Sequence, residues 1–367
     1  MKYYVIAGEA SGDLHGSNLI KQLKVQDPSA QIKCWGGDLM QATGAHLVKH
    51  YRDLAFMGFT EVIKNLPTIL GNLRFCKEDI ISYQPDAIIL IDYPGFNLRI
   101  AEWAKKQGIK VIYYIAPQVW AWKANRVKKM KTCIDLMLCI LPFEKAYFKN
   151  NWNWDVHYVG HPLIEVIEKF KSANQSDIKP IIALLPGSRK QEIAKKLPIM
   201  LSVADKFPQY EFVVAQAPGQ DDAFYEPFLE GQQNVKVVKD GTYHLLSAST
   251  AALVTSGTAT LETALFGVPE IVCYKGSAIS YQIARRLIKI KFISLVNLIM
   301  DKEIVKELIQ DELNTANLAR ELQFITSNPQ KISELKSEYQ QLYKKLAEGG
   351  HASKNAASLI SNLLQNK

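Results

Sequence analysis

The sequence predicts an α/β fold made of two Rossmann-like domains in succession, with a helical C-terminal tail. Short apolar runs, typical of buried parallel strands, alternate with helical patterns along the chain. A polar stretch at residues 165–179 divides this alternation into two halves. In each half the first run, at residues 3–7 and 181–185, ends in a turn of small residues before a helix. Nucleotide-binding folds have this order of elements.

The composition supports a folded protein with two domains. The chain has 367 residues, of which 48% are hydrophobic and 22% charged, so it can bury a large core and is not disordered. We expect domains at residues 1–165 and 166–345, and a last helical segment at 346–367. No apolar run reaches ~18 residues, and residues 1–7 lead directly into a glycine-rich turn, so neither a membrane span nor a signal peptide is expected. Five scattered cysteines without a C-x-x-C spacing indicate free thiols in a reducing cytosol and no zinc site.

The formal charge of +8 predicts an acidic partner: a phosphorylated substrate, an anionic membrane or a nucleic acid. Two basic clusters are candidates for this contact, and solvated helix faces explain either cluster alone. The first cluster contains Lys123, Arg126, Lys128, Lys129 and Lys131, and the second contains Arg285, Arg286, Lys289 and Lys291.

In the first half, a strand at residues 3–7 precedes a glycine-rich turn and a helix at 17–24. G-x-G-x-x-G and the Walker lysine pattern are absent. Ser11 and Asp13 are suited to capping this helix or to contacting a ligand, and the sequence leaves both roles open. His15 fits a helix surface equally well.

Residues 51–80 combine apolar side chains with a basic rim. Such a segment can lie in a membrane interface or receive acyl chains, although a core-facing pair of helices gives the same pattern. The candidate membrane and acyl-binding residues are Phe56, Met57, Phe59, Val62, Leu66, Leu70 and Arg74.

Asp92 directly follows the predicted strand at residues 87–91 and is suited to being a general base or a helix cap. After the next strand, at 111–116, Trp120 and Trp122 occupy a loop, where they must pack on the neighbouring domain or on a sugar or acyl face. Strands at 136–140 and 156–159 complete the first half.

The second half has two turns of small residues. The first contains Gly187, Ser188 and Arg189, whose backbone N–H groups and guanidinium suit a phosphate, although an ordinary turn is also possible. Strands are expected at residues 212–215, 235–238 and 252–255, and helices at 243–248, 304–313, 318–325, 332–346 and 356–364. The second turn contains Ser256, Gly257 and Thr258; Glu262, one helical turn later, can hold ligand hydroxyls or pair with the helix dipole.

Seven motifs follow one another along the chain. They are Ala7-Gly-Glu-Ala-Ser-Gly-Asp13, Asp92-x-Pro-x-Phe-Asn97, Pro117-x-Val-Trp-Ala-Trp122, Val159-Gly-His-Pro-Leu163, Leu184-Leu-Pro-Gly-Ser-Arg189, Ser256-Gly-Thr-x-Thr-Leu-Glu262 and Ser294-Leu-x-Asn297. Taken in order, these motifs resemble the lipid-A-disaccharide synthase family over about residues 5–312. Gln118 and Gly95 depart from the family pattern, which leaves the fine contacts of those two loops open.

The resemblance implies a GT-B glycosyltransferase, whose two domains face each other across a cleft. The implied reaction transfers 2,3-diacylglucosamine from its UDP derivative to the 6-hydroxyl of 2,3-diacylglucosamine 1-phosphate, with inversion. Asp92 would be the base, the two turns with Arg189 would stabilise the departing UDP without a metal or cofactor, and Glu262 would hold the ribose. Four residues are placed near the donor sugar or acceptor by the resemblance alone: Asn297, Ser11, Gly12 and His161.

The resemblance also implies partners. Both substrates are lipids, so the protein would act at the cytoplasmic surface of the inner membrane as a peripheral protein, and as a homodimer in which C-terminal segments are exchanged. One rival is another GT-B enzyme, either a soluble UDP-N-acetylglucosamine epimerase or a transferase to a different lipid. A nucleic-acid-binding module is disfavoured because no recognition motif or continuous basic-aromatic face is present.

Overall fold

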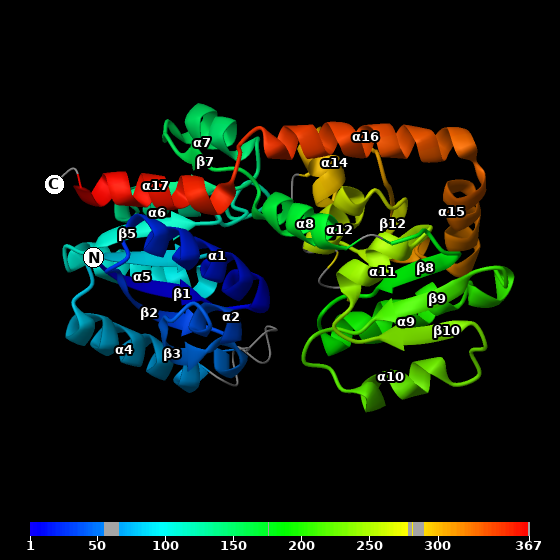
Figure 1. Ribbon diagram of the computed structural model, residues 1–367, viewed down its shortest axis with the longest axis horizontal. Coiled ribbons are helices and arrows are strands. Elements are labelled where there is room, and N and C mark those ends of the chain that lie inside the picture. Colours follow the sequence, from blue (N-terminus) through cyan, green and yellow to red (C-terminus); the bar gives the residue numbers. More distant parts are fainter. Residues whose placement is uncertain (55–65, 175, 278–280, 282–289, 366–367) are drawn as a thin grey trace. The chain divides into compact units, whose positions relative to one another are not determined.

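The computed structural model describes residues 1–54, 66–174, 176–277, 281 and 290–365. The chain forms two compact units (Figure 1). Unit 1 contains Met1–Pro162 and Leu346–Lys367, and unit 2 contains Leu163–Lys345. Each unit has one parallel sheet whose strands are connected by helices, which confirms the predicted fold class.

The sheet of unit 1 has seven strands in the order β3-β2-β1-β4-β5-β6-β7. Side chains of β1 alternate between two cores, with Tyr4 and Ile6 in one and Tyr3 and Val5 in the other. Because both faces are covered, β1 appears in the sequence as an unbroken apolar run. The strands are β1 (Lys2–Ala7), β2 (Gln31–Gly36), β3 (His46–His50), β4 (Ala87–Ile91), β5 (Lys110–Tyr114), β6 (Leu136–Cys139) and β7 (His157–Tyr158).

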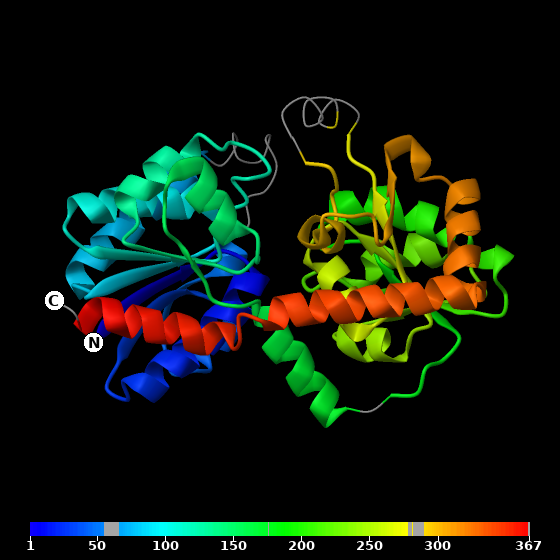
Figure 2. The same cartoon turned by 90° about the horizontal axis from the view of Figure 1, so that it is seen from above.

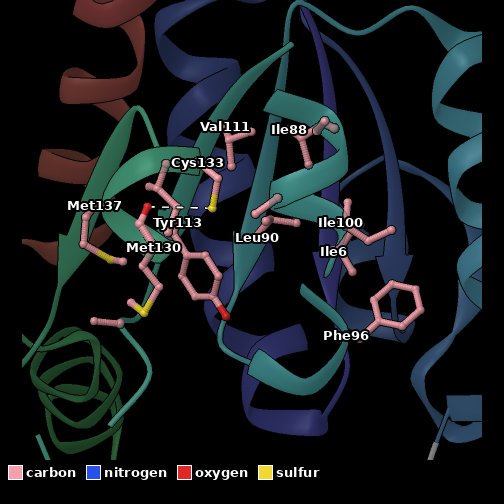
Figure 3. Close-up of a cluster of buried hydrophobic side chains, with 14 of the residues drawn as sticks. Ile6, Ile88, Leu90, Phe96, Ile100, Val111, Tyr113, Met130, Cys133 and Met137 are labelled. Carbon is pink, nitrogen blue, oxygen red and sulfur yellow. Dashed lines mark hydrogen bonds between the residues drawn. The ribbon is translucent and has the colours of Figure 1, made fainter. Parts of the chain in front are cut away.

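Helices cover both faces of this sheet. One core lies under α4, α5 and α6; Figure 3 shows part of it, with Tyr113 of β5 near Leu90 and Met130. The other core lies under α1 and α17. The helices of unit 1 are α1 (Ala10–Gln26), α2 (Asp38–Gln41), α4 (Leu66–Tyr83), α5 (Pro94–Lys106), α6 (Arg126–Cys133), α7 (Glu144–Trp152) and α17 (Ala352–Gln365), with a 3-10 helix η1 (Tyr51–Leu54).

The sheet of unit 2 has six parallel strands in the order β10-β9-β8-β11-β12-β13. They are β8 (Ile181–Leu185), β9 (Glu211–Ala215), β10 (Val235–Val238), β11 (Ala251–Thr255), β12 (Glu270–Tyr274) and β13 (Lys306–Ile309). The helices are α8 (Pro162–Ala173), α9 (Lys190–Leu201), α10 (Asp222–Leu229), α11 (Thr242–Ala248), α12 (Thr258–Phe266), α14 (Leu295–Met300), α15 (Thr315–Ser327) and α16 (Pro329–Ala347), with 3-10 helices η2 (Ala204–Lys206) and η3 (Gln310–Glu312).

Two segments differ from the sequence prediction. The helix expected at residues 304–313 is wrong: β13 lies there, because its short apolar run pairs with β12 in the sheet. The polar stretch at 165–179 is largely helical, since α8 extends to Ala173. Leu163, Ile164 and Ile167 give α8 a buried apolar face, while polar residues occupy its other side.

The C-terminal segment returns to unit 1. Figure 2 shows α16 along unit 2 and α17 along the sheet of unit 1, where α17 packs on α1 through the core that contains Ala356 and Ile360. A Cβ atom on Gly160 would lie 2.4 Å from the Gly350 carbonyl oxygen. The segment before α17 can therefore pack against the backbone at residue 160 only because a glycine is there. The Asn355 side chain donates to the Val159 carbonyl at 3.1 Å and fixes this return.

Candidate active site

The candidate residues of both units lie where the strand order reverses. In unit 1, β1 pairs with β4, and the turns after them begin at Gly8 and Asp92. In unit 2, β8 pairs with β11, and these strands lead into Pro186 and Ser256. The carboxyl ends of strands at such a switch point form the ligand site of open α/β sheets. The fold therefore gathers the predicted turns at one location in each unit.

Asp92 occupies a strained backbone position. Its φ is +44°, and the next residue, Tyr93, has φ +49°. A left-handed conformation at a residue with a side chain costs roughly 1–3 kcal/mol, and such strain is concentrated at functional sites. Two buried side chains hold the Asp92 carbonyl oxygen in place: the Tyr113 hydroxyl donates to it at 2.6 Å and Asn97 Nδ2 at 2.8 Å. The core thus fixes the backbone of Asp92.

The environment of Asp92 favours its protonated form more than water does. Although the side chain is exposed, surrounding protein displaces most of its water, and the Glu9 carboxylate adds repulsion. These two effects raise the pKa of Asp92 to about 6. A carboxylate with this pKa is ionised at neutral pH and is a stronger base than an ordinary aspartate.

A second carboxyl with a raised pKa, the buried Glu144 at the start of α7, was not predicted from the sequence. Burial raises the pKa of Glu144 to about 7, although hydrogen bonds from Leu141 and Trp120 oppose the rise. Trp120 Nε1 donates to Glu144 Oε1 at 3.2 Å, and the Leu141 amide donates to Oε2 at 3.0 Å. Glu144 therefore holds the half-buried Trp120, whereas Trp122 is 48% exposed. Only the fold brings this glutamate to the tryptophan loop.

The glycine-rich turn after β1 begins α1 earlier than expected, at Ala10, so Ser11 lies inside the helix and is exposed. Asp13 does cap a helix, but not its own: it accepts from the backbone amides of Gly37, Leu39 and Met40 at the start of α2. Gly12 is buried, and a Cβ there would lie 3.0 Å from the Cβ of Ala7. Gly12 therefore allows α1 to pack closely on β1.

Two histidines are buried in the same unit. His15 is 7% exposed and so does not lie on a helix surface. Burial lowers the pKa of His15 to about 4, and burial together with His15 lowers the pKa of His161 to about 3. Both rings are neutral at physiological pH. His161 thus lies near His15. In the sequence, His161 is one residue before Pro162, where the Met1–Pro162 part of unit 1 ends.

In unit 2, the first predicted phosphate turn follows β8. Gly187 has φ +121°, which favours glycine. Ser188 is followed by Arg189, which is the last residue before α9. Arg189 Nη1 pairs with Glu192 Oε1 at 3.1 Å. The ion pair is exposed and hence weak, so a phosphate can compete for the guanidinium.

The turn after β11 has a similar form. Gly257 has φ +147°, and among the described residues no atom beyond its chain neighbours lies within 4 Å of where its Cβ would be. Ser256 Oγ donates to the Ile293 carbonyl at 2.7 Å, which anchors the turn, and Thr258 begins α12 with its side chain exposed. The amides at this helix start are suited to an anion.

Lys196 is a buried cation beneath both turns that sequence reasoning missed. It is 3% exposed, and its ammonium donates to the hydroxyl of Thr255, the residue before Ser256. A Cβ on Gly187 would lie 3.5 Å from Lys196 Nζ. Burial lowers the pKa of Lys196, and Glu192, 3.8 Å away, opposes that decrease. Among the many lysines of this chain, nothing in the sequence singled this one out.

Two other predicted residues of unit 2 have distinct surroundings. Glu262 is half-buried and accepts from the Tyr243 hydroxyl at 2.9 Å, and burial raises its pKa. Asn297 is fully buried: its Nδ2 donates to the Val305 carbonyl and to Glu307, and its Oδ1 accepts from the amides of Ile304 and Val305. The observed role of Asn297 is to hold this segment together.

The candidate membrane surface is described only in part. Phe56, Met57, Phe59 and Val62 lie outside the described residues, as do Arg285, Arg286 and Lys289 of the second basic cluster, and nothing is described of the Leu66 side chain. Leu70 on α4 is 56% exposed, and Arg74 pairs with Glu78. A groove of about 390 Å³ runs past Leu70 to Ile81 and Trp103. In the described ranges no helix is both long and apolar enough to cross a bilayer, and no cluster of three metal-binding side chains occurs.

The two parallel sheets with their alternating helices define a GT-B-like fold. A UDP-GlcNAc 2-epimerase from Neisseria meningitidis superposes with a TM-score of 0.65 over 100% of both chains, at 14% identity. The glycotransferase of kitacinnamycin superposes with a TM-score of 0.66 over 99% of both, at 15% identity. At these identities the likeness shows the fold alone.

Sequence comparison identifies the family. The model of the lipid-A-disaccharide synthetase family matches residues 3–361. The lipid-A-disaccharide synthase of Syntrophus aciditrophicus is 38% identical, over 97% of this chain and 96% of its own, and that of Trichlorobacter lovleyi is 34% identical, over 98% and 97%. The chain belongs to the lipid-A-disaccharide synthetase family, as the motifs predicted, and is a glycosyltransferase.

Proposed function

We propose that this protein transfers 2,3-diacylglucosamine from UDP-2,3-diacylglucosamine to the 6-hydroxyl of 2,3-diacylglucosamine 1-phosphate. The products are a β(1→6)-linked disaccharide 1-phosphate and UDP. Family membership over residues 3–361 is the observation that carries this proposal. The residues at the two switch points supply groups suited to the two halves of the chemistry.

Asp92 is the proposed base. Inversion requires one displacement at the anomeric carbon, during which the acceptor hydroxyl loses a proton. Asp92 lies at the carboxyl end of β4, where the hydrogen bonds from Tyr113 and Asn97 fix its backbone, and its raised pKa suits proton abstraction near neutrality. The carboxylate accepts the proton as the new glycosidic bond forms.

Unit 2 is proposed to hold the donor. As the bond to UDP breaks, negative charge grows on the diphosphate, and the amides at Gly187, Ser188 and Gly257 with Arg189 would stabilise it without a metal. The carboxylate of Glu262, oriented by Tyr243, would accept hydrogen bonds from the ribose hydroxyls. No cofactor enters this scheme.

The test is UDP release from UDP-diacylglucosamine, with and without diacylglucosamine 1-phosphate, by the native protein and by Asp92→Asn. We expect release that depends on the acceptor and falls by ~100-fold or more in the variant. Asp155→Asn is the matched control, because Asp155 is an exposed aspartate at the opposite end of the sheet, before β7. Release from a soluble UDP-sugar, or no dependence on the acceptor, would reject the proposed reaction.

We also propose that the protein works as a homodimer, peripherally bound to the cytoplasmic face of the inner membrane. Leu70, Phe75 and Ile81 are exposed apolar side chains on α4, and the net charge of +8 suits an anionic surface. Co-sedimentation with phosphatidylglycerol vesicles, compared with neutral vesicles, tests the first part. Light scattering of the eluted protein tests the second.

A further inference from the structure

A cavity of about 230 Å³ lies between α5 and α6 of unit 1. Three cationic side chains line it, namely Arg99, Arg126 and Lys129, and apolar side chains of both helices form its floor. Pro94 and Gly95, the first residues of α5, complete the wall. This cavity is called the basic cavity below.

The protein neutralises little of the charge in the basic cavity. In the part of the chain that the structure describes, Lys129 pairs with Glu102 at 2.5 Å, whereas neither Arg99 nor Arg126 forms an ion pair. Arg99 Nη1 donates to the Gly95 carbonyl at 2.8 Å, and the half-buried Arg126 has its Cζ 5.8 Å from the centre of the Trp122 ring. Two guanidinium groups therefore remain available to an anion.

The helix ends add to this positive field. Both α5 and α6 begin at the basic cavity, at Pro94 and Arg126, and neither has an acidic residue in its first turn. A helix start carries a partial positive charge, which an acidic side chain would normally offset. Two guanidiniums with two such starts are suited to a doubly charged phosphate, which accepts forked hydrogen bonds from arginine.

The basic cavity is close to the proposed base. Its wall begins at Pro94, two residues after Asp92. Burial raises the pKa of Tyr113 well above its ordinary value; the Asp92 carboxylate adds to the rise and the Arg126 guanidinium opposes it. Asp92 and Arg126 thus act on the same side chain, whose hydroxyl donates to the Asp92 carbonyl oxygen at 2.6 Å. An acceptor with its hydroxyl at Asp92 can place another group in the cavity.

We infer that the basic cavity binds the phosphate monoester of the acceptor sugar, with Arg99 and Arg126 as its principal ligands. This inference rests on the proposed function, because it assumes that the acceptor is a sugar 1-phosphate whose 6-hydroxyl meets Asp92. The cavity would select phosphorylated acceptors and fix which hydroxyl faces the base.

The experiment compares diacylglucosamine 1-phosphate with diacylglucosamine that lacks the phosphate, in detergent micelles. The proteins are the native chain, Arg99→Gln/Arg126→Gln, and the control Lys21→Gln/Lys145→Gln, which loses the same charge at exposed positions outside the cavity. In the arginine variant we expect kcat/KM for the phosphorylated acceptor to fall by about 100-fold. The rate with the unphosphorylated acceptor and the KM for the donor should stay near the native values, and the lysine control should match the native protein.

Three other results would overturn the inference, and they can be told apart. If the arginine variant keeps the native preference for the phosphorylated acceptor, or if its kcat/KM falls equally for both acceptors, the cavity does not bind the acceptor phosphate. If the preference is kept but binding to phosphatidylglycerol vesicles is lost, the cavity binds membrane phosphates instead. If the native protein releases no UDP with either acceptor, the proposed function itself is wrong, and the inference fails with it.

Discussion

The two sheets have the same topology around their central strands, yet the turns at their switch points differ in chemistry. In unit 1, Asp92 and Tyr93 occupy left-handed conformations despite their side chains, and the pKa of Asp92 is raised to about 6. In unit 2, glycines Gly187 and Gly257 occupy the positive φ values, and Lys196 is buried beneath them. The turn of unit 1 thus carries a titratable side chain with a raised pKa, whereas the turns of unit 2 combine glycine backbone with a buried cation.

This difference fits the two tasks proposed for the two units. A base needs a fixed position, and Asp92 combines backbone strain with hydrogen bonds from Tyr113 and Asn97 to its carbonyl oxygen. Backbone amides that must approach a phosphate need space instead, so glycine is required. The predictions below test whether the two sites are as distinct as this comparison suggests.

The largest effect is expected from Gly257→Ala. A Cβ at φ +147° forces the turn out of the shape in which its amides face a phosphate, so UDP affinity should fall by about 100-fold. Gly267→Ala is the control, because Gly267 also has a positive φ, of +81°, with open space around it, but lies at the other end of α12. Calorimetric titration measures the UDP affinity of the two variants. Equal losses in the two variants would mean that general strain, not the turn, is responsible.

Lys196→Met should weaken UDP binding by about 30-fold. The substitution keeps most of the side-chain volume but removes a buried charge beside both turns, and a hydrogen bond to a charged group contributes roughly 1.5–3 kcal/mol. Lys195→Met, at the exposed neighbouring position, is the matched control. Unchanged UDP affinity in a folded Lys196→Met protein would show that unit 2 recognises the diphosphate through its backbone and Arg189 alone.

The sequence predicted the two sites unequally. The turns of unit 2 were proposed as a phosphate site because glycine and serine follow an apolar run, and Asp92 was proposed as a base because it follows a buried strand. Lys196 and Glu144 were not, since their importance comes from burial beside residues far away in sequence: Thr255 for one and Trp120 for the other. The strand at Lys306–Ile309 was mistaken for a helix because a short apolar run does not specify its partner, which here is β12.

The buried carboxyl of Glu270 tests whether a raised pKa by itself marks a site. Glu270 is the first residue of β12, so it lies at the end of the strands opposite the turns. Burial raises its pKa well above the usual value. Neither of its carboxyl oxygens has a hydrogen-bond partner in the described residues. The unfolded chain ionises this group above about pH 4.5 and the folded chain does not, so it costs stability as pH rises. Glu270→Met should therefore raise the free energy of unfolding by about 1–2 kcal/mol at pH 8 and less at pH 4. Urea unfolding at the two pH values measures this; a variant that is less stable at pH 8 would contradict it, and transferase activity should not change.

The smallest effect concerns the acid limb of the pH profile. Because Asp92 must be ionised to act as a base, kcat/KM should fall tenfold per pH unit below about pH 6. Burial is the larger cause of the raised pKa and Glu9 the smaller, so Glu9→Gln should lower the pKa of Asp92 only in part. At pH 5 the Glu9→Gln variant should then keep a fraction of its maximal kcat/KM that is about threefold larger than the fraction kept by the native enzyme. Near pH 8 the variant and the native enzyme should have the same kcat/KM. If the acid limb of the profile is unchanged in Glu9→Gln, repulsion by the Glu9 carboxylate does not contribute to the raised pKa of Asp92. Burial alone then raises this pKa.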